Sequence, residues 1–332
     1  MNATALTVVI VVVALCFDYT NGFHDAANAI ATSVSTRALT PRVALAMAAV
    51  ANVVGALIST KVAATIGSGI IAAPQGRDGL IVVLSGLLGA IVWNLGTWYF
   101  GLPSSSSHAL IGGLIGAALV GAVDVKWNAV GDKVVVPMVS SPMAGLVLGY
   151  LFMLALLWAF RRANAHKVNR GFRWTQIASA GGMAFGHGTQ DAQKTMGVIA
   201  LALTVSGHLG NGDGIPIWVI LCAAGAISLG TYSGGWRIMR TLGRRIFSLS
   251  PTSGFAAQTV ASGLMLTTSQ LGLPVSTTHV ITSSVMGVGA TRRFSAVRWG
   301  VAGNIVMAWV LTLPAAALVA ALVWEILHPL LD

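Results

Sequence analysis

The chain has 332 residues, of which 55% are hydrophobic and only 8% are charged, and its formal net charge is +10. Together with a mean hydropathy of +0.81, this composition excludes a soluble globular domain, which needs far more polar surface. We therefore expect an integral membrane protein. The basic excess follows from membrane topology, as shown below, and does not imply a nucleic-acid partner.

Apolar segments follow one another along the whole chain. In chain order they cover residues 4–17, 43–60, 80–97, 109–123, 142–160, 174–185 continuing through 195–205, 215–229, 255–271, 280–290 and 300–327. One helical crossing of a membrane needs roughly 20 apolar residues, and most segments come close to that length. The sequence therefore predicts an all-α polytopic membrane protein with about 10 hydrophobic elements.

The positions of the basic residues predict the orientation in the membrane. Most lysines and arginines gather in four places, at residues 37–42, 161–173, 237–245 and 292–298. The positive-inside rule puts such loops on the cytoplasmic side. The loops between them carry mixed charge or none and are expected outside, together with both termini. We expect a multi-pass protein of the plasma (inner) membrane, in contact with lipid.

Two motifs occur once in each half of the chain. Residues 21–29 read NGFHDAANA and 101–108 read GLPSSSSH, while 187–194 read HGTQDAQK and 272–279 read GLPVSTTH. The motif aspartates are 166 residues apart and the final histidines 171, which indicates an internal duplication. When the expected crossings are followed along the chain, the first unit begins outside the membrane and the second begins inside. The second unit is therefore inverted relative to the first. We expect inverted repeats over 1–140 and 174–332, joined by a connecting helix and basic loop over 141–173, with broken helices and helical hairpins around a midplane site.

Each unit holds an aspartate beside amides in apolar surroundings. An ionised carboxylate in lipid is costly unless it faces a cavity, a cation or a partner, so Asp25 and Asp191 should point inward. Gly22 and Gly188 are expected to loosen the backbone into a broken helix. The alternative is that these polar residues only join helices. We expect the carboxylates to bind the coupling cation. The amides of Asn28, Gln190 and Gln193 are expected to join them as cation ligands or to satisfy freed backbone groups.

A run of hydroxyls follows Gly-Leu-Pro in each unit. Ser and Thr at a helix start are common caps, and capping alone accounts for one hydroxyl in each run. Three hydroxyls beside the free N–H groups and positive end of a helix also suit a tetrahedral oxyanion. We expect two such helix ends to face one anion, which would be bound by Ser105, Ser106, Ser107, Ser276, Thr277 and Thr278.

Further polar residues accompany the motifs. Lys194 is expected at membrane depth, where it neutralises Asp191 or attracts the anion, or else snorkels toward water without a transport role. Asp18, one helical turn before Gly22, is a candidate proton carrier or simply marks the end of the first helix. Asn21 is expected to satisfy freed backbone groups or to coordinate a cation.

Four histidines lie within or beside the motifs: His24, His108, His187 and His279. No His-x-x-His or cysteine spacing supports a structural or catalytic transition metal, so we expect none, and Na⁺ at the aspartates is the metal ion to consider. His108 and His279 are expected to hydrogen-bond within their hairpins. No cofactor is expected.

The alternative of an intramembrane Ser-His-Asp hydrolase has little support. Adjacent residues such as Ser107 and His108 point in different directions on a helix, and a duplicated nucleophile has no obvious purpose. We expect a transporter and not an enzyme.

Six segments resemble the PiT inorganic phosphate transporters, in order and across nearly the full chain. They are NGFHDAANA, WNLGTWYFGLPSSSSH (93–108, which includes Asn94), HGTQDAQK, GWRIMRTLG (235–243), GLPVSTTH and MAWVLTLPAA (307–316). The resemblance implies a polytopic inner-membrane symporter of inverted repeats, often a homodimer. It also implies inorganic phosphate between the hydroxyl-bearing hairpins and cations at the motif aspartates.

This chain departs from the family pattern in two places. Many relatives have Asn where Gln190 stands, which points to an altered cation site, and the loop 161–173 is much shorter than in many relatives. His24 before the aspartate resembles the low-affinity bacterial members that use protons, which favours H⁺ over Na⁺ modestly. Two alternatives stay open: a sulfate or other oxyanion permease of the same fold, and transport of phosphate as a metal–phosphate complex.

Overall fold

The computed structural model describes residues 2–72, 76–210 and 213–331, and the regular elements in these ranges are helices apart from one isolated β-bridge. The longer helices are α1 (Ala3–Ser35), α2 (Pro41–Ala56), α3 (Lys61–Gly69), α4 (Gly76–Phe100), α5 (Ser106–Val120), α7 (Val136–Ala159), α8 (Ala165–Val205), α9 (Ile217–Ser233), α11 (Pro251–Gln270), α12 (Thr277–Ala290) and α13 (Trp299–Leu331). The shorter ones are α6 (Trp127–Val130), η1 (Gly131–Val135), α10 (Trp236–Arg240), η2 (Thr241–Arg245) and η3 (Phe294–Ala296).

Within the described ranges, four helices are long and apolar enough to cross a membrane, or up to six if each bent pair counts as one span. The bent pairs are α2 with α3, at 74°, and α9 with α10, at 58°. Large apolar side chains such as Leu318, Leu322 and Ile326 of α13 stay exposed on the outside, as lipid contact requires. The predicted all-α membrane fold is confirmed.

Local sequence explains where several helices begin. Asn2 caps α1 by accepting the backbone N–H of Ala5 at 2.8 Å. Ser250 and Ser253 form a capping box at the start of α11, each side chain bonding the other residue's backbone N–H. Pro41 and Pro251 occupy first positions, where the missing N–H costs nothing.

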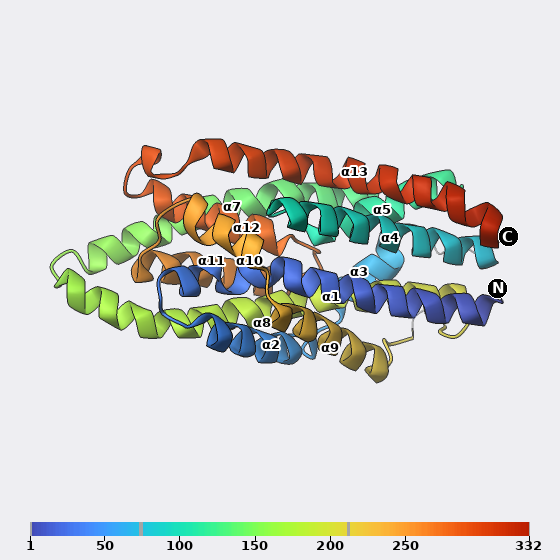
Figure 1. Ribbon diagram of the computed structural model, residues 1–332, viewed down its shortest axis with the longest axis horizontal. Helices are drawn as coiled ribbons and strands as arrows, with labels where there is room; N and C mark the ends of the chain where they lie inside the picture. Colours follow the sequence, from blue (N-terminus) through green and yellow to red (C-terminus); the bar gives the residue numbers. More distant parts are fainter. Residues whose placement is uncertain (1, 73–75, 211–212, 332) are drawn as a thin grey trace.

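The helices run lengthwise through the molecule, with both termini at one end and the loop between α7 and α8 at the other (Figure 1). We call the end that carries both termini the termini end. Helix α1 starts at this end and α8 runs toward it, so the two motif helices are antiparallel. The first hairpin, α4 and α5, lies toward the termini end, and the second, α11 and α12, toward the opposite end. The second half thus repeats the first with reversed direction.

The halves are interleaved. Helix α5 of the first half packs on α13 of the second, and α12 packs on α7; α1 packs on α9, and α2 on α8. Each half therefore buries its apolar faces largely against the other.

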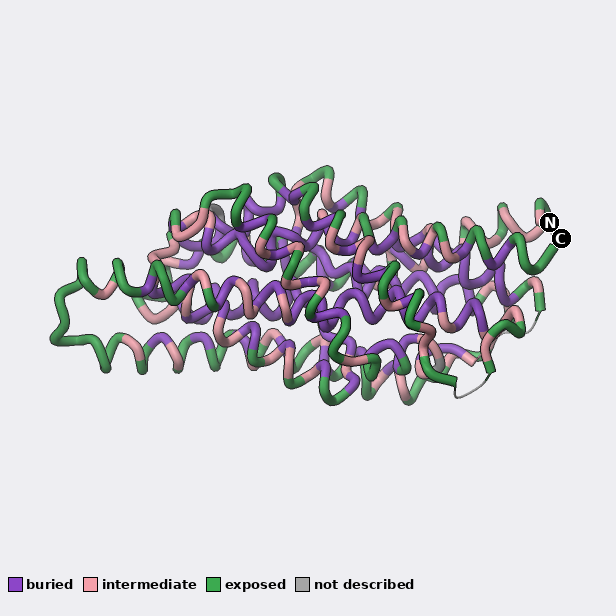
Figure 2. The backbone as a smooth tube through the Cα atoms, turned by 90° about the horizontal axis from the view of Figure 1, so that it is seen from below, coloured by how far each residue is buried: buried purple, intermediate pink, exposed green. Residues whose placement is uncertain are grey.

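A polar layer separates two apolar clusters. Along α1, residues 6–17 belong to one cluster and 26–31 to the other, and along α8 the clusters hold 192–203 and 183–184. Between them lie the motif residues of both helices, in the interior where Figure 2 shows mostly buried backbone. The fold thus places its buried polar groups midway along the bundle.

The helices that carry the motif aspartates are continuous, so the expectation of a break at each motif glycine was wrong. A Cβ on Gly22 would lie 2.4 Å from the carbonyl oxygen of Ile227, and one on Gly188 would lie 2.2 Å from that of Asn52. These glycines serve close packing of α1 on α9 and of α8 on α2. The chain breaks lie instead at the hairpin turns, 101–105 and 271–276.

Short helices hold the two hairpin turns in the same manner: α10 and η2 at the first turn and α3 at the second. Thr241 donates to the carbonyl of Gly101 at 3.0 Å and Arg237 donates to that of Tyr99 at 2.5 Å. In the other half, Thr65 donates to the carbonyl of Gly272 at 2.8 Å and Lys61 to that of Gln270 at 3.0 Å. Gly101 and Gly272 have φ of +66° and +68°, a conformation that favours glycine. We call these contacts the two turn clamps.

Candidate functional site

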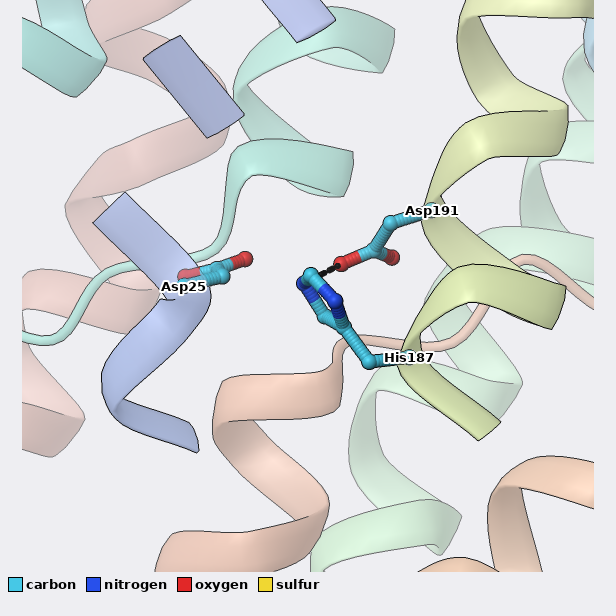
Figure 3. Close-up of side chains that lie close together, drawn as sticks. All are labelled: Asp25, His187 and Asp191. Carbon is cyan, nitrogen blue, oxygen red and sulfur yellow. Dashed lines mark ion pairs between the residues drawn. The ribbon is translucent and has the colours of Figure 1, made fainter. Parts of the chain in front are cut away.

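The two motif aspartates meet at the centre of the polar layer. Asp25 of α1, Asp191 of α8 and His187, one turn before Asp191, place one ligand atom each within 4.8 Å of one another (Figure 3). All three side chains are buried. Nε2 of His187 lies 3.0 Å from Oδ2 of Asp191, close but outside hydrogen-bond geometry. Two carboxylates and an imidazole so arranged can hold a small cation.

Hydroxyls from both hairpins converge on these carboxylates. Ser106, at the start of α5, donates to Asp25 at 2.9 Å. Thr278, from α12, donates to the other oxygen of Asp25 at 3.2 Å, and Thr277 lies 3.5 Å from Asp25 and 3.3 Å from Asp191. The hydroxyls that the sequence assigned to the anion thus contact the two aspartates that it assigned to the cation.

Not every hydroxyl in the runs faces the aspartates. Ser105 and Ser276 cap α5 and α12, accepting the backbone N–H groups of His108 and His279 at 3.2 Å and 3.3 Å. Ser107 donates to the carbonyl of Val275 in the opposite hairpin at 3.4 Å. The capping interpretation therefore explains one residue in each run, as the sequence allowed.

Lys194 links the site together. Its ammonium group contacts the carboxylate of Asp191 and the hydroxyl of Ser107, and it lies 3.3 Å from the carbonyl of Val275. The side chain is fully buried. The snorkelling interpretation was wrong, because the ammonium neutralises an internal carboxylate and does not reach water.

The predicted amide ligands divide into two groups. Asn28 donates to Thr277 at 3.2 Å and Thr278 at 2.8 Å, so it orients hydroxyls of the site. Gln193 instead accepts the backbone N–H of Val62 at 2.8 Å at the start of α3. Gln190 donates to the carbonyl of Met265 at 3.2 Å, among other groups around the second hairpin turn. Both glutamines support backbone through these bonds.

Each motif helix also carries a histidine that contacts the site. His24 bonds Oδ1 of Asp25 at 2.8 Å and the hydroxyl of Thr97 at 3.2 Å. The other histidine, His187, bonds the amide oxygen of Asn52 at 3.0 Å. Sequence reasoning missed Asn52, although a lone amide within the apolar segment 43–60 was a signal that it faces inward.

His108 and His279 lie side by side with ring centroids 4.9 Å apart, and His279 stacks on Trp309 at 4.0 Å. Their ring nitrogens have no hydrogen-bond partner among the described residues. The expectation that these rings bond within their hairpins was therefore wrong, since their backbone N–H groups make the intrahairpin bonds.

Three more predicted residues are buried beside the site: the Asp18 carboxylate lies against Thr195 and Asn21, whereas the side-chain amide of Asn94 has no hydrogen-bond partner among the described residues. Asp18 and Asn21 lie on α1 before Asp25, and Asn94 lies on α4.

The chain is similar to phosphate transporters in both sequence and structure. A sequence model of the phosphate transporter family matches residues 21–320. The chain is 49% identical to a probable low-affinity inorganic phosphate transporter of Rhizobium meliloti (strain 1021), over 97% of each chain. It is 45% identical to a protein of the same description from Bacillus subtilis (strain 168), again over 97% of each. A solved structure described as "The sodium-dependent phosphate transporter" is similar with a TM-score of 0.85 at 26% identity, covering 98% of this chain and 99% of that one.

Proposed function

The chain belongs to the phosphate transporter family and is a membrane transporter of inorganic phosphate, not an enzyme; from this premise we propose that it works by cation symport. In this proposal an alternating-access site at the interface of the repeats binds phosphate and the coupling cation together. The observation that carries it is the convergence of Ser106, Thr277 and Thr278 on Asp25 and Asp191.

Phosphate is bound, in this proposal, between the two hairpins. The N-termini of α5 and α12 supply free N–H groups and positive dipole ends, and Ser106, Ser107, Thr277 and Thr278 add hydroxyl donors. Hydroxyls accept as well as donate, which suits an anion that still carries a proton, whereas sulfate offers no proton. This argument favours phosphate over the alternative of a sulfate permease.

The cation is needed to offset charge. Asp25 and Asp191 carry two formal negative charges and Lys194 one positive charge, so the centre is negative before an anion arrives. A cation among Asp25, His187 and Asp191 would supply the missing charge next to the hydroxyls. The two carboxylates are oxygen ligands that suit a hard cation such as Na⁺, and the similar solved structure is described as sodium-dependent. His24 beside Asp25 keeps H⁺ as the alternative.

Uptake of labelled phosphate into proteoliposomes, under separately imposed sodium and proton gradients, tests the proposal. We expect an inward cation gradient to drive accumulation above the equilibrium level. Accumulation that ignores both gradients would refute symport. Excess unlabelled sulfate should leave uptake intact, and block by sulfate without block by phosphate would identify a sulfate permease.

A further inference from the structure

Two cavities lie one beyond the other along the contact between α7 and α11. The first, of about 310 Å³, lies at the end opposite the termini, beside the loop between α7 and α8 (Figure 1). Its wall combines the arginines Arg161 and Arg292 with the apolar side chains of Leu156, Leu157 and Phe160. The second, of about 580 Å³, is lined mainly by apolar side chains. We call the first the basic cavity and the second the apolar groove.

The register of the two helices puts the cavities in line. Helix α7 runs toward the loop end, where it lines the basic cavity with residues 153–160, and α11 begins at this cavity with residues 250–252. The apolar groove is lined by residues 148–152 of α7 and 259–267 of α11, farther from the loop end. Along α7, Phe160 lies about 18 Å from Leu148. One leaflet of a membrane contributes about 15 Å of hydrocarbon, so the two cavities together match its depth.

Four phenylalanine rings join the walls of the two cavities. Phe152 of the apolar groove contacts Phe255 of α11, with ring centroids 6.2 Å apart. Phe255 contacts Phe172 of α8 at 5.1 Å, and Phe172 contacts Phe160 of the basic cavity at 5.4 Å. An apolar wall therefore leads from one cavity to the other.

The positive charge of the basic cavity is not balanced by an acid. Within the described part of the chain, no carboxylate lines it, and residues 133–190 and 214–324, which hold its whole lining, contain no aspartate or glutamate. The guanidinium of Arg161 lies over the ring of Trp158 at 5.2 Å, and that of Arg292 over Phe247 at 5.6 Å. These cation–π contacts orient the arginines without neutralising them. The cavity therefore attracts an anion from outside the chain.

The other polar groups of the basic cavity suit a phosphate group. Ser250 and Thr252 belong to the start of α11, so the positive end of this helix dipole lies at the cavity. Thr252 donates to the amide oxygen of Asn169 at 3.3 Å, which leaves the amide N–H groups of Asn169 to donate elsewhere. Arginine is the side chain whose planar donors best match phosphate oxygens.

Exposed tryptophans mark this level as a membrane boundary. Trp158, one turn before Arg161, is 69% exposed, and Trp174 is 74% exposed. Tryptophan is enriched where the hydrocarbon meets the headgroups, and the positive-inside rule puts the basic loop 161–173 on the cytoplasmic side. The cytoplasmic leaflet carries anionic lipids, and basic pockets between membrane helices bind their headgroups.

We propose that the basic cavity and the apolar groove together bind one anionic phospholipid of the cytoplasmic leaflet. Its phosphate group lies between Arg161 and Arg292, and one acyl chain lies in the groove between α7 and α11. Inorganic phosphate shares the chemistry of the headgroup but gives no reason for the groove. The bound lipid would hold α11 against α7, and α11 is the first arm of the hairpin that presents Thr277 and Thr278 to the central site.

Native mass spectrometry of the purified full-length protein tests the headgroup site. The protein is mixed with equal amounts of dioleoyl phosphatidylglycerol, which is anionic, and dioleoyl phosphatidylcholine, which is zwitterionic. We expect the wild type to retain one phosphatidylglycerol per chain in preference. The double variant Arg161→Gln/Arg292→Gln should weaken this binding about ten- to a hundredfold. Arg170→Gln/Arg173→Gln removes the same charge from the same end outside the cavity and should bind like the wild type.

Gly263 provides a separate test of the acyl-chain site. It lines the apolar groove, and a Cβ there would meet no heavy atom within 4 Å, so Gly263→Leu fills the groove without a clash in the fold. We expect this variant to bind dioleoyl phosphatidylglycerol more weakly and to bind the short-chain dihexanoyl lipid as the wild type does. Gly96→Leu, at an equally open position on α4, is the matched control and should bind both lipids normally.

The outcomes separate a lipid from free phosphate and from general attraction to charge. Equal retention of the two dioleoyl lipids by the wild type, or equal losses in the two arginine variants, would show that the basic cavity is not a specific site. If excess inorganic phosphate displaces phosphatidylglycerol while Gly263→Leu changes nothing, the cavity binds free phosphate and the lipid proposal is wrong. These measurements involve no transport, so they are independent of the symport proposal.

Discussion

Ser105 and Ser106 are sequence neighbours with different tasks. Ser105 stands just outside α5 in an extended conformation and turns its oxygen back to the helix N–H groups, whereas Ser106, the first helical residue, points across to Asp25. Ser276 and Thr277 repeat the division at α12. The backbone conformation thus separates neighbouring hydroxyls into those that cap a helix and those that reach the aspartates.

That division predicts different phenotypes. Ser105→Ala should lower the thermal stability of the purified protein by the equivalent of about 1 kcal/mol, the usual value of a lost N-cap, with little change in apparent phosphate affinity. Ser106→Ala should instead weaken affinity about ten- to a hundredfold, because it removes a hydrogen bond to a charged ligand. Melting curves and uptake kinetics for both variants measure this. Equal effects on affinity would show that Ser105 is also a ligand.

Neutralising either motif aspartate should abolish coupled uptake. Asp25→Asn and Asp191→Asn each remove one cation-compensating charge while nearly preserving side-chain size. Initial rates in proteoliposomes measure the loss, with Asp213→Asn, an exposed loop acid, as the control that keeps wild-type rates. Wild-type rates in either purified, inserted motif variant would contradict the assignment of the cation site.

The elements around the site come in related pairs. Each hairpin presents one helix N-terminus to the centre, and each turn is held by short helices of the other half, α10 and η2 for the first hairpin and α3 for the second. The pairs are not identical. The guanidinium carbon of Arg237 also lies 5.1 Å from the ring centroid of Trp98 and 4.8 Å from that of Tyr99, whereas Lys61 makes a single side-chain bond, to the carbonyl of Gln270. The first clamp therefore has an additional aromatic contact.

A shared anion predicts coupling between the two hairpins. Ser106→Ala and Thr277→Ala should each weaken apparent affinity, and the double variant should differ from the sum of the two free-energy changes by more than about 0.5 kcal/mol. Phosphate affinities of the four proteins complete the cycle. Strict additivity, or an effect from only one hairpin, would mean that the anion does not lie between them.

The unequal clamps predict unequal tolerance of conservative changes. Arg237→Lys should lower thermal stability by about 0.5–1 kcal/mol, because an ammonium cannot reproduce the planar stacking on two rings. Lys61→Arg keeps a donor for its single bond and should leave stability unchanged. Melting temperatures of the two variants give the comparison, and an equal fall in both would rule out a special role for the aromatic contact.

The sequence predicted much at the level of the whole molecule and less at the level of contacts. Apolar segments indicated a helical membrane protein, and the paired motifs contained the aspartates and hydroxyls that meet in the polar layer, because both signals depend on local pattern. The clamp helices α3 and α10 were missed, since their short length and their basic residues resemble loops. The backbone role of Gln193 was one of the two roles expected for it, but its partner, the start of α3, could not be named because the pattern did not reveal that helix.

Whole-molecule orientation provides the last prediction. Both termini lie at one end and the basic loop 161–173 lies at the other, so the positive-inside rule puts the termini outside. Cys16 and Cys222 are free and would be replaced by alanine first. On that background, His208→Cys, in the loop after α8, should react with a membrane-impermeant thiol reagent in intact cells. His166→Cys, at the exposed start of α8, should react only after permeabilisation, because the positive-inside rule puts this end on the cytoplasmic side. The reverse labelling pattern would mean that both termini lie on the cytoplasmic side, while the central site stays midway along the bundle.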